Sequence, residues 1–396
     1  MRDSKWGCHV GRTFGIGGAD LKNVAGHLPP AIAMLLLCTT ISAWEFGITN
    51  QALAEDLTAK EDPTSHVEAA KISPELSRYR VASDGIIPFA LGLTDSSGEI
   101  FTLNRPVMGA GVQTLASFDP NLDLFKAEIE QGYDRSYGLV QMPMAVAWSV
   151  EERTLRLRRL PGDVATSIVV NDIDPIENIL AGNWEDKQIV DLRRDGKLRV
   201  VDFQTGNITL AIESDLNVTC AAVRGNRLIF AGRPKADLNR DMPNELSYIS
   251  ILQSWDIATG EKLAAQILGY HVARLEFSEN GKWIACAGGL SFFQQPQFGT
   301  GQLDVFRSDL AGWSRRYFAQ AYIKAARFID NRTMALGLEN GWGYVVDFRK
   351  GKRIAKAKLH QGSVLDIAVG KSKLFSSGFD GTLTIWQYTP AQRKAE

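Results

Sequence analysis

The sequence lacks the short patterns by which many enzymes are recognised. It contains no C-x-x-C, no H-E-x-x-H, no G-x-S-x-G and no P-loop pattern, so no zinc protease, α/β-hydrolase or P-loop nucleotidase is indicated. The glycine-rich segment Gly15–Gly18 follows no strand-like segment, so it is not expected to bind a nucleotide. We therefore predict a non-enzymatic protein with no catalytic residue, no cofactor and no metal site.

Cysteine and histidine are scarce. Of four cysteines, only Cys220 and Cys286 lie beyond residue 54, and two cysteines do not make a disulfide framework. Both occur in strand-like runs, so we expect buried free thiols rather than a disulfide. Beyond residue 54 the only histidines are His66, His271 and His360, and a three-histidine metal site would need these distant residues to converge.

The sequence also lacks an excess of charge of either sign. It has 44 basic and 45 acidic residues, a formal net charge of −1, so no broad attraction to nucleic acid or to an anionic membrane is expected. With 45% hydrophobic and 22% charged residues, the composition is that of an ordinary folded protein. Any partner must therefore be selected by local features of the surface.

An apolar run near the N-terminus is too short to span a membrane as a stable helix. Ala31–Ala43 has 13 residues, whereas a span needs roughly 18 to 20. Basic residues precede the run, and the small-residue pattern Ala52-Leu53-Ala54 follows it, which is the order of a secretory signal peptide. We expect residues 1–54 to be a leader removed on export to the periplasm or the exterior. Retention as an N-terminal membrane anchor is the alternative.

Strand-like segments recur every 40 to 55 residues. The clearest copy ends the chain, with Val364–Val369, Leu374–Gly378, an Asp-Gly turn at Asp380, and an alternating strand that ends in Trp386. Earlier copies of this third strand are Gly343–Asp347, Leu303–Arg307, Leu252–Asp256, Leu198–Asp202, Leu155–Arg159 and Ile100–Asn104. Seven copies at this spacing predict four short strands per repeat.

Segments rich in small residues precede several of these strands, and we expect them to be second strands, because small residues let backbones approach closely. They are Ala90–Gly92, Ala181–Gly182, Ala231–Gly232, Ala285–Gly289 and Ala335–Gly337. Two third strands continue into turns ending in Gly206 and Gly260. Outer fourth strands are expected to follow these turns, at Asn207–Ile212 and Glu261–Leu268.

The C-terminal copy resembles a WD40 repeat, although Gln387 replaces the usual Asp after the Trp. The resemblance implies an all-β, seven-bladed WD40-like β-propeller over residues 76–387, after a linker at 55–75 and before a tail at 388–396. Only nine residues follow Gln387, so the last blade lacks an outer strand. We predict that residues 76–82 supply it by pairing with residues 382–387, which removes an exposed edge.

In the family that this stretch resembles, a His, a Ser or Thr, an Asp and the Trp form a hydrogen-bonded chain. The matching residues are His360, Ser376, Asp380 and Trp386. The resemblance implies a structural role, because a fully satisfied buried polar chain fixes one arrangement of strands. A catalytic Ser-His-Asp set is the less favoured alternative, since it also needs an exposed nucleophile and an oxyanion hole.

Three segments between expected second and third strands are long: Asn183–Arg194, Arg233–Ser250 and Leu290–Thr300. Long loops on a rigid frame often carry recognition, so we predict that they bind a protein partner on the top face of neighbouring blades. The segment Asp119–Tyr137 is expected between the first and second strands of the second blade, on the opposite face.

Six residues in two of these loops are candidate partner contacts: Phe292, Phe293, Phe298, Asp237, Asn239 and Asp241. Exposed aromatic residues are typical of protein interfaces, although these could instead fold back against the blade. The three polar residues have the one-three-five spacing of a calcium loop. However, Met242 stands where that loop needs Gly and Tyr248 where it needs Glu, so a metal is not predicted.

The sequence thus predicts an exported, non-enzymatic scaffold that recognises a protein. The alternative is a propeller enzyme with a central-channel site, such as a quinoprotein-like dehydrogenase, a hydrolase or a lyase. The Asp-x-x-Thr-Gly turns resemble those of quinoprotein repeats, but Leu210 and Leu263 stand where such repeats usually have Trp. A third possibility is the recognition half of a larger assembly, which would co-elute with one defined subunit.

Overall fold

The computed structural model describes strands between residues 76 and 169. It describes residues 177–235, 249–290, 300–311, 314–370 and 373–387 together with their side chains. The expected leader, linker and tail lie outside the described residues. Every described strand belongs to one compact unit, residues 68–396. Among the described residues, no helix is long and apolar enough to span a membrane.

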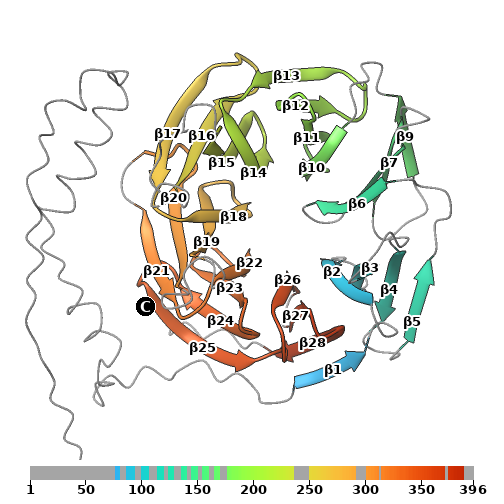
Figure 1. The fold of residues 1–396 in the computed structure, drawn as a ribbon, viewed down its shortest axis with the longest axis vertical. Helices are drawn as coiled ribbons and strands as arrows, with labels where there is room; N and C mark the ends of the chain where they lie inside the picture. Colours follow the sequence, from blue (N-terminus) through green and yellow to red (C-terminus); the bar gives the residue numbers. More distant parts are fainter. Residues whose placement is uncertain are drawn as a thin grey trace, which may run out of the picture. The chain divides into compact units, whose positions relative to one another are not determined.

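The described secondary structure is entirely β, and the strands form antiparallel four-stranded sheets (Figure 1). Before residue 170, one sheet consists of β2 (Ile86–Leu93), β3 (Ile100–Pro106), β4 (Thr114–Asp119) and β5 (Leu124–Glu128). The next consists of β6 (Arg135–Val140), β7 (Met144–Ser149), β8 (Thr154–Arg159) and β9 (Ala165–Val169).

The next sheets also take their four strands consecutively from the sequence. They are β10 (Ile176–Asn183), β11 (Gln188–Arg193), β12 (Lys197–Asp202) and β13 (Ile208–Glu213); β14 (Leu216–Arg224), β15 (Arg227–Pro234), β16 (Ser250–Asp256) and β17 (Lys262–Leu268); β18 (His271–Phe277), β19 (Trp283–Gly289), β20 (Gly301–Arg307) and β21 (Arg315–Ala319); and β22 (Ile323–Phe328), β23 (Thr333–Leu338), β24 (Trp342–Asp347) and β25 (Lys352–Lys358).

The last sheet joins both ends of the described chain. It contains β26 (Val364–Val369), β27 (Lys373–Gly378) and β28 (Thr382–Gln387), and its outer strand is β1 (Leu76–Arg80). In the register, Leu76 lies opposite Trp386 and Arg80 opposite Thr382. The predicted pairing is therefore confirmed for residues 76–80, while residues 81 and 82 lie outside the described part.

Aspartate turns link third strands to outer strands. The Oδ1 atom of Asp202 accepts the backbone N–H groups of Gln204 and Thr205 at 2.8 and 2.9 Å, and Gly206 completes the turn with φ 74°. The turn after Asp256 has the same plan. Glycine suits this position because it adopts a positive φ without strain. The two predicted turns are confirmed, as are the outer strands β13 and β17 that follow them.

Neighbouring sheets pack face to face through apolar side chains, and the first strand of each sheet from β10 onward contacts the first strand of the next. The largest fully buried side chains are Trp386, Tyr270, Tyr344, Phe230, Phe348 and Ile189. Arg327 of β22 also joins three first strands. Its guanidinium lies 2.7 Å from the Glu276 carboxylate of β18 and 3.3 Å from that of Asp366 on β26.

A β-bulge interrupts the first strand of every consecutive-strand sheet and of the last sheet. In the part described with side chains, the register skips Glu177, Leu180, Thr219, Ala273, Lys324 and Leu365. A bulge re-aims the side chain it carries and strengthens the local twist. These bulges could not be predicted from the sequence, because the skipped residues share no chemical type.

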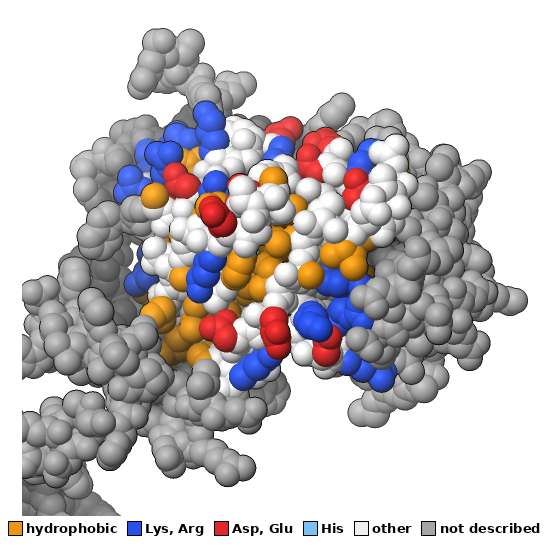
Figure 2. All heavy atoms as spheres, turned by 90° about the horizontal axis from the view of Figure 1, so that it is seen from above, with side chains coloured by type: hydrophobic (Ala, Val, Ile, Leu, Met, Phe, Trp, Pro, Cys, Tyr) orange, Lys and Arg blue, Asp and Glu red, His pale blue; other side chains and the backbone are white. Residues whose placement is uncertain are grey.

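The outer strands carry exposed side chains. Apolar examples are Ile208 on β13 and Leu263 and Ile267 on β17. Figure 2 shows this side of the unit, where hydrophobic side chains gather between charged ones. By contrast, β25 exposes Lys352, Arg353 and other cations. Charged side chains are a common protection of edge strands.

Several strand predictions in the N-terminal half were wrong by one strand. Ala90–Gly92 and Ala181–Gly182 belong to first strands, β2 and β10, and Ile100–Asn104 lies in the second strand β3. The segment Asn183–Arg194 is no long loop, because it contains a short turn and β11. Asp119–Tyr137 contains β5, the outer strand of the preceding sheet. In this half of the chain, first and second strands are both short and have similar mixtures of apolar and polar residues. The repeat spacing therefore predicted the sheets there but not the position of each strand within its sheet.

Candidate functional site

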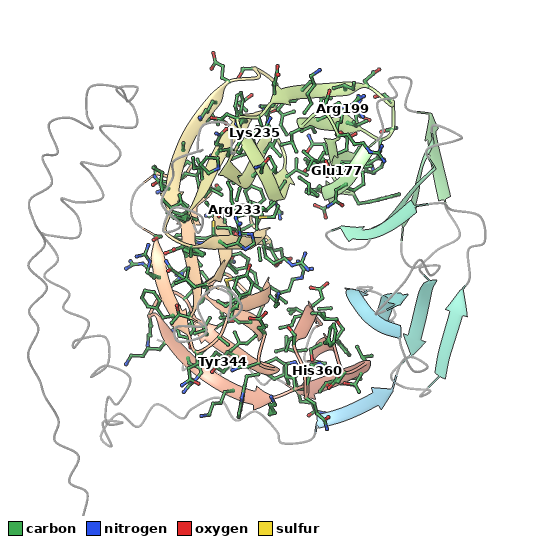
Figure 3. The ribbon with its side chains drawn as sticks, in the orientation of Figure 1. Glu177, Arg199, Arg233, Lys235, Tyr344 and His360 are labelled. Carbon is green, nitrogen blue, oxygen red and sulfur yellow. The ribbon has the colours of Figure 1, made fainter. Side chains whose placement is uncertain are left out.

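Three of the four residues predicted for the polar chain meet in the last sheet, where Figure 3 labels His360. The Nε2 atom of His360 lies 2.8 Å from the Ser376 hydroxyl, and its Nδ1 atom lies 3.2 Å from Oδ1 of Asp380. Asp380 also accepts the backbone N–H of Gln361 at 2.8 Å. This network ties the segment before β26 to the turn between β27 and β28.

Trp386 is not part of this network. Its indole N–H is buried and has no hydrogen-bond partner among the described residues. The ring instead lies in an apolar cluster with Leu359 and Leu374. Thr382, which the sequence analysis missed, takes a place in the network, with its hydroxyl 2.9 Å from His360 Nδ1 and 2.7 Å from Asp380 Oδ1.

The geometry of this network favours a structural role over a catalytic one. His360 and Ser376 have exposed fractions of 1% and 0%. A serine that attacks a substrate must be accessible, so the buried Ser376 hydroxyl cannot act as a nucleophile here. Burial alone would raise the pKa of Asp380, but hydrogen bonds from His360, Thr382 and the Gln361 backbone hold that pKa well below its usual range.

Replacement of Asp380 by Ala is expected to destabilise the protein by about 1–3 kcal/mol, because the buried His360 and its neighbours lose their acceptor. Chemical denaturation followed by tryptophan fluorescence measures this loss. Glu279→Ala is the control, since Glu279 is an exposed residue in the turn between β18 and β19. Equal stability of the two variants would show that Asp380 does not hold the sheet.

The two remaining long loops leave the frame from equivalent positions. Residues 236–248 connect β15 to β16 and residues 291–299 connect β19 to β20, and both lie outside the described residues. All six candidate contacts, Asp237, Asn239, Asp241, Phe292, Phe293 and Phe298, fall in these segments. The first loop is shorter than predicted, because Arg233 and Pro234 belong to β15, where they pair with β14, and Ser250 begins β16.

The described ends of these loops are firmly anchored. The Ser250 hydroxyl accepts the backbone N–H of Val272 on the neighbouring sheet at 3.0 Å. The Leu290 N–H donates to the Thr300 carbonyl at 3.0 Å. The frame therefore fixes where each loop begins and ends.

A group of polar residues surrounds these loop ends, and we call it the rim cluster: Arg233, His271, Tyr322, Lys324 and Glu339. It is built from the end of β15, the starts of β18 and β22, and the end of β23. His271 Nδ1 is hydrogen-bonded to the Tyr322 hydroxyl, and their rings stack with centroids 6.0 Å apart. The Nζ of Lys324 lies 5.0 Å from the Tyr322 ring centroid and 3.5 Å from the Glu339 carboxylate.

In the rim cluster the rings of His271 and Tyr322 are uncharged, whereas Arg233 and Lys324 around them are positive. Burial lowers the pKa of His271 to about 4, and the nearby cations Arg233 and Lys324 contribute to that decrease, so the imidazole is uncharged at neutral pH. Burial raises the pKa of Tyr322, which keeps the phenol protonated. Of these five residues, two are conspicuous in the sequence: His271 as one of the scattered histidines and Arg233 as the predicted start of a loop.

Cys220 and Cys286 are free and buried, as predicted. Burial raises the pKa of the Cys220 thiol to about 12 and that of Cys286 well above its usual range. Because the thiolate is the reactive form, neither residue is a nucleophile. No group of three or more His, Cys, Asp or Glu side chains within the described segments is placed to hold a metal ion.

No family model and no curated protein matches the chain. Among solved structures, the chain is similar to a crystal structure of the computationally designed Ika8 protein. The TM-score is 0.52, and 16% of residues are identical over 78% of this chain and 98% of that chain. At this identity the similarity concerns the fold alone.

Proposed function

We propose that the chain is a non-enzymatic, exported WD40-like β-propeller that binds a protein partner. In this proposal seven sheets are its blades, β1 completes the last blade, and the loops at residues 236–248 and 291–299 contact the partner. The surface of contact is the side of the frame that carries the rim cluster.

The strand arrangement supports the propeller part of the proposal. Each sheet has four antiparallel strands in simple order, and first strands lie against the first strands of neighbouring sheets, including β26 against β2 and β10 against β6. The pairing of β1 with β28 leaves the last sheet with the same strand number as the others. The polar network of His360, Ser376 and Asp380 adds to the resemblance to WD40 repeats.

The observation that carries the binding part is that two long loops start from equivalent edges of adjacent, well-anchored sheets. Most hairpin connections need only two to five residues, so loops of this length are not required to join the strands. The described ends of both loops lie near His271: Gly289 at the end of β19 pairs with it, and Arg233 near the end of β15 is close enough to lower its pKa. A partner that bridges the two loops would therefore lie across the rim cluster.

Replacement of residues 236–248 by Asn-Gly is expected to abolish capture of the partner without unfolding the protein. Gly232 pairs with Ile251, so a short turn can join β15 and β16 while the buried Ser250 stays in place. The measurement is affinity capture of the full chain from its native extract, with quantitative mass spectrometry of one protein retained by the wild type.

Ile208→Ser serves as the matched control, because Ile208 is 41% exposed on the outer strand β13, away from both loops. This variant should retain the partner. If the loop variant retained it equally well, while melting as the wild type does, recognition through this loop would be refuted.

A further inference from the structure

Arg233 is a partly buried cation without a counter-charge among the described residues. It lies near the end of β15, opposite Asn217 in the register, and Figure 3 labels it beside β18. Its Nε atom is buried without a hydrogen-bond partner, and within the described segments Arg233 forms no ion pair. Buried donors are paired in most native structures, so an unpaired one calls for a specific cause. A bound acceptor is one such cause.

The described neighbours of Arg233 do not neutralise it. His271 is uncharged, Tyr322 is protonated, and Asn217 carries no charge. Lys324 adds a second positive charge, and the Glu339 carboxylate at 3.5 Å balances one of the two. The five residues of the rim cluster thus carry one net positive charge, beside the stacked rings of His271 and Tyr322. Arg274, whose Nε donates to the Lys324 carbonyl, adds a further positive charge near Tyr322.

We propose that Arg233, together with Lys324 of the same rim cluster, binds a carboxylate from an acidic segment of the partner protein. This inference rests on the proposed function and names the chemistry that the partner must offer. A guanidinium donates two parallel hydrogen bonds to the two oxygens of a carboxylate, and the surplus of positive charge around Arg233 favours an anion.

The experiment uses the full chain and a short fluorescent peptide of alternating Glu and Gly residues, with binding followed by fluorescence anisotropy at low salt. Arg233→Gln is expected to weaken binding about tenfold or more, the loss of a charge-assisted hydrogen bond. Arg315→Gln is the matched control, because Arg315 is exposed on β21 and lies outside the rim cluster. A peptide of alternating Gln and Gly should not bind.

Unchanged affinity of Arg233→Gln, or equal binding of the Gln peptide, would overturn the proposal. Inorganic phosphate that displaced the acidic peptide at lower concentration than acetate would overturn the carboxylate assignment. Arg233→Met separates binding from folding, since removal of an unpaired buried cation should leave the melting temperature equal or higher while peptide binding is lost. A lower melting temperature would assign Arg233 a structural role instead.

The two proposals fail separately. If the peptide binds through Arg233 but the variant lacking residues 236–248 still captures the partner, the loop proposal is wrong and the carboxylate site stands. If the loop variant loses the partner while Arg233→Gln binds the peptide as the wild type does, only the carboxylate site is wrong.

Discussion

Replacement of Arg199 by Met is expected to destabilise the protein by about 3–5 kcal/mol. Arg199 on β12 faces Asp191 on β11, with Nε to Oδ1 at 3.0 Å and Nη2 to Oδ2 at 2.6 Å. Their exposed side-chain fractions are 2% and 0%. Without Arg199, a carboxylate remains buried without the two donors that compensate its lost hydration. Chemical denaturation at neutral pH measures the loss.

This loss should depend on pH in a defined direction. Burial raises the pKa of Asp191, and Arg199 counteracts that rise, so the variant has a still higher folded-state pKa. The folded variant then holds a proton that the unfolded chain releases near pH ~4. Stability of the variant relative to the wild type therefore falls as the pH rises above the folded-state pKa of Asp191 in the wild type, which burial already raises, and the deficit is complete above the higher folded-state pKa of the variant.

Two controls separate the buried charge from the loss of a side chain. The double variant Asp191→Leu with Arg199→Met should be more stable than Arg199→Met alone, because the buried carboxylate left without Arg199 is gone, although the buried Arg193 then loses the nearby Asp191 charge. Arg307→Met removes a partner from the exposed pair with Asp309 and should change stability by less than about 1 kcal/mol. If Arg199→Met lost as little stability as Arg307→Met, the assignment of Arg199 and Asp191 as a buried ion pair would be contradicted.

Replacement of Gly288 by Ala should be comparably severe, about 3 kcal/mol or more, at the upper end of overpacking effects. A Cβ atom at Gly288 would overlap the His271 carbonyl oxygen and would lie 3.1 Å from the Ala273 nitrogen. Both are backbone atoms of the bulged strand β18, so neither can rotate away. Thermal denaturation with circular dichroism measures the decrease in melting temperature.

Gly269→Ala is the matched control, because no atom lies within 4 Å of the position that its Cβ would take, and its φ is not in the positive region. Alanine there should be neutral or stabilise by about 0.4–1 kcal/mol, through the lower entropy of the unfolded chain. If Gly288→Ala had the same melting temperature as Gly269→Ala, the close approach of β18 and β19 would be disproved.

The C-terminal strands were predictable because their local signals agree. Alternation in Leu383–Trp386, small residues in Ser376–Gly378 and the Asp-Gly turn at Asp380 all point to the same hairpin, and β27 and β28 follow. In the N-terminal half such turn signals are fewer. There the alternation of a strand such as Ile100–Asn104 does not reveal its position in the sheet.

The candidate site was less predictable, because it depends on contacts between distant residues. Tyr322 meets His271 only because β18 and β22 start at the same edge of neighbouring sheets. Arg233 was assigned to a loop, and its lack of a counter-charge among the described residues depends on contacts that only the fold creates. The predicted hydrogen bond of Trp386 was wrong for a related reason, since the ring is surrounded by apolar side chains.

The pairing of β1 with β28 has a consequence for biosynthesis. The ribosome makes β1 before every other described strand, and it makes the partner β28 after all of them. Until β28 is made, the N–H and C=O groups of β1 lack the strand with which they pair in the folded protein. Such long-range closure is slow because the entropy of joining distant segments must be overcome first. A nascent chain stalled before residue 382 would therefore be a preferred client of chaperones that bind extended segments.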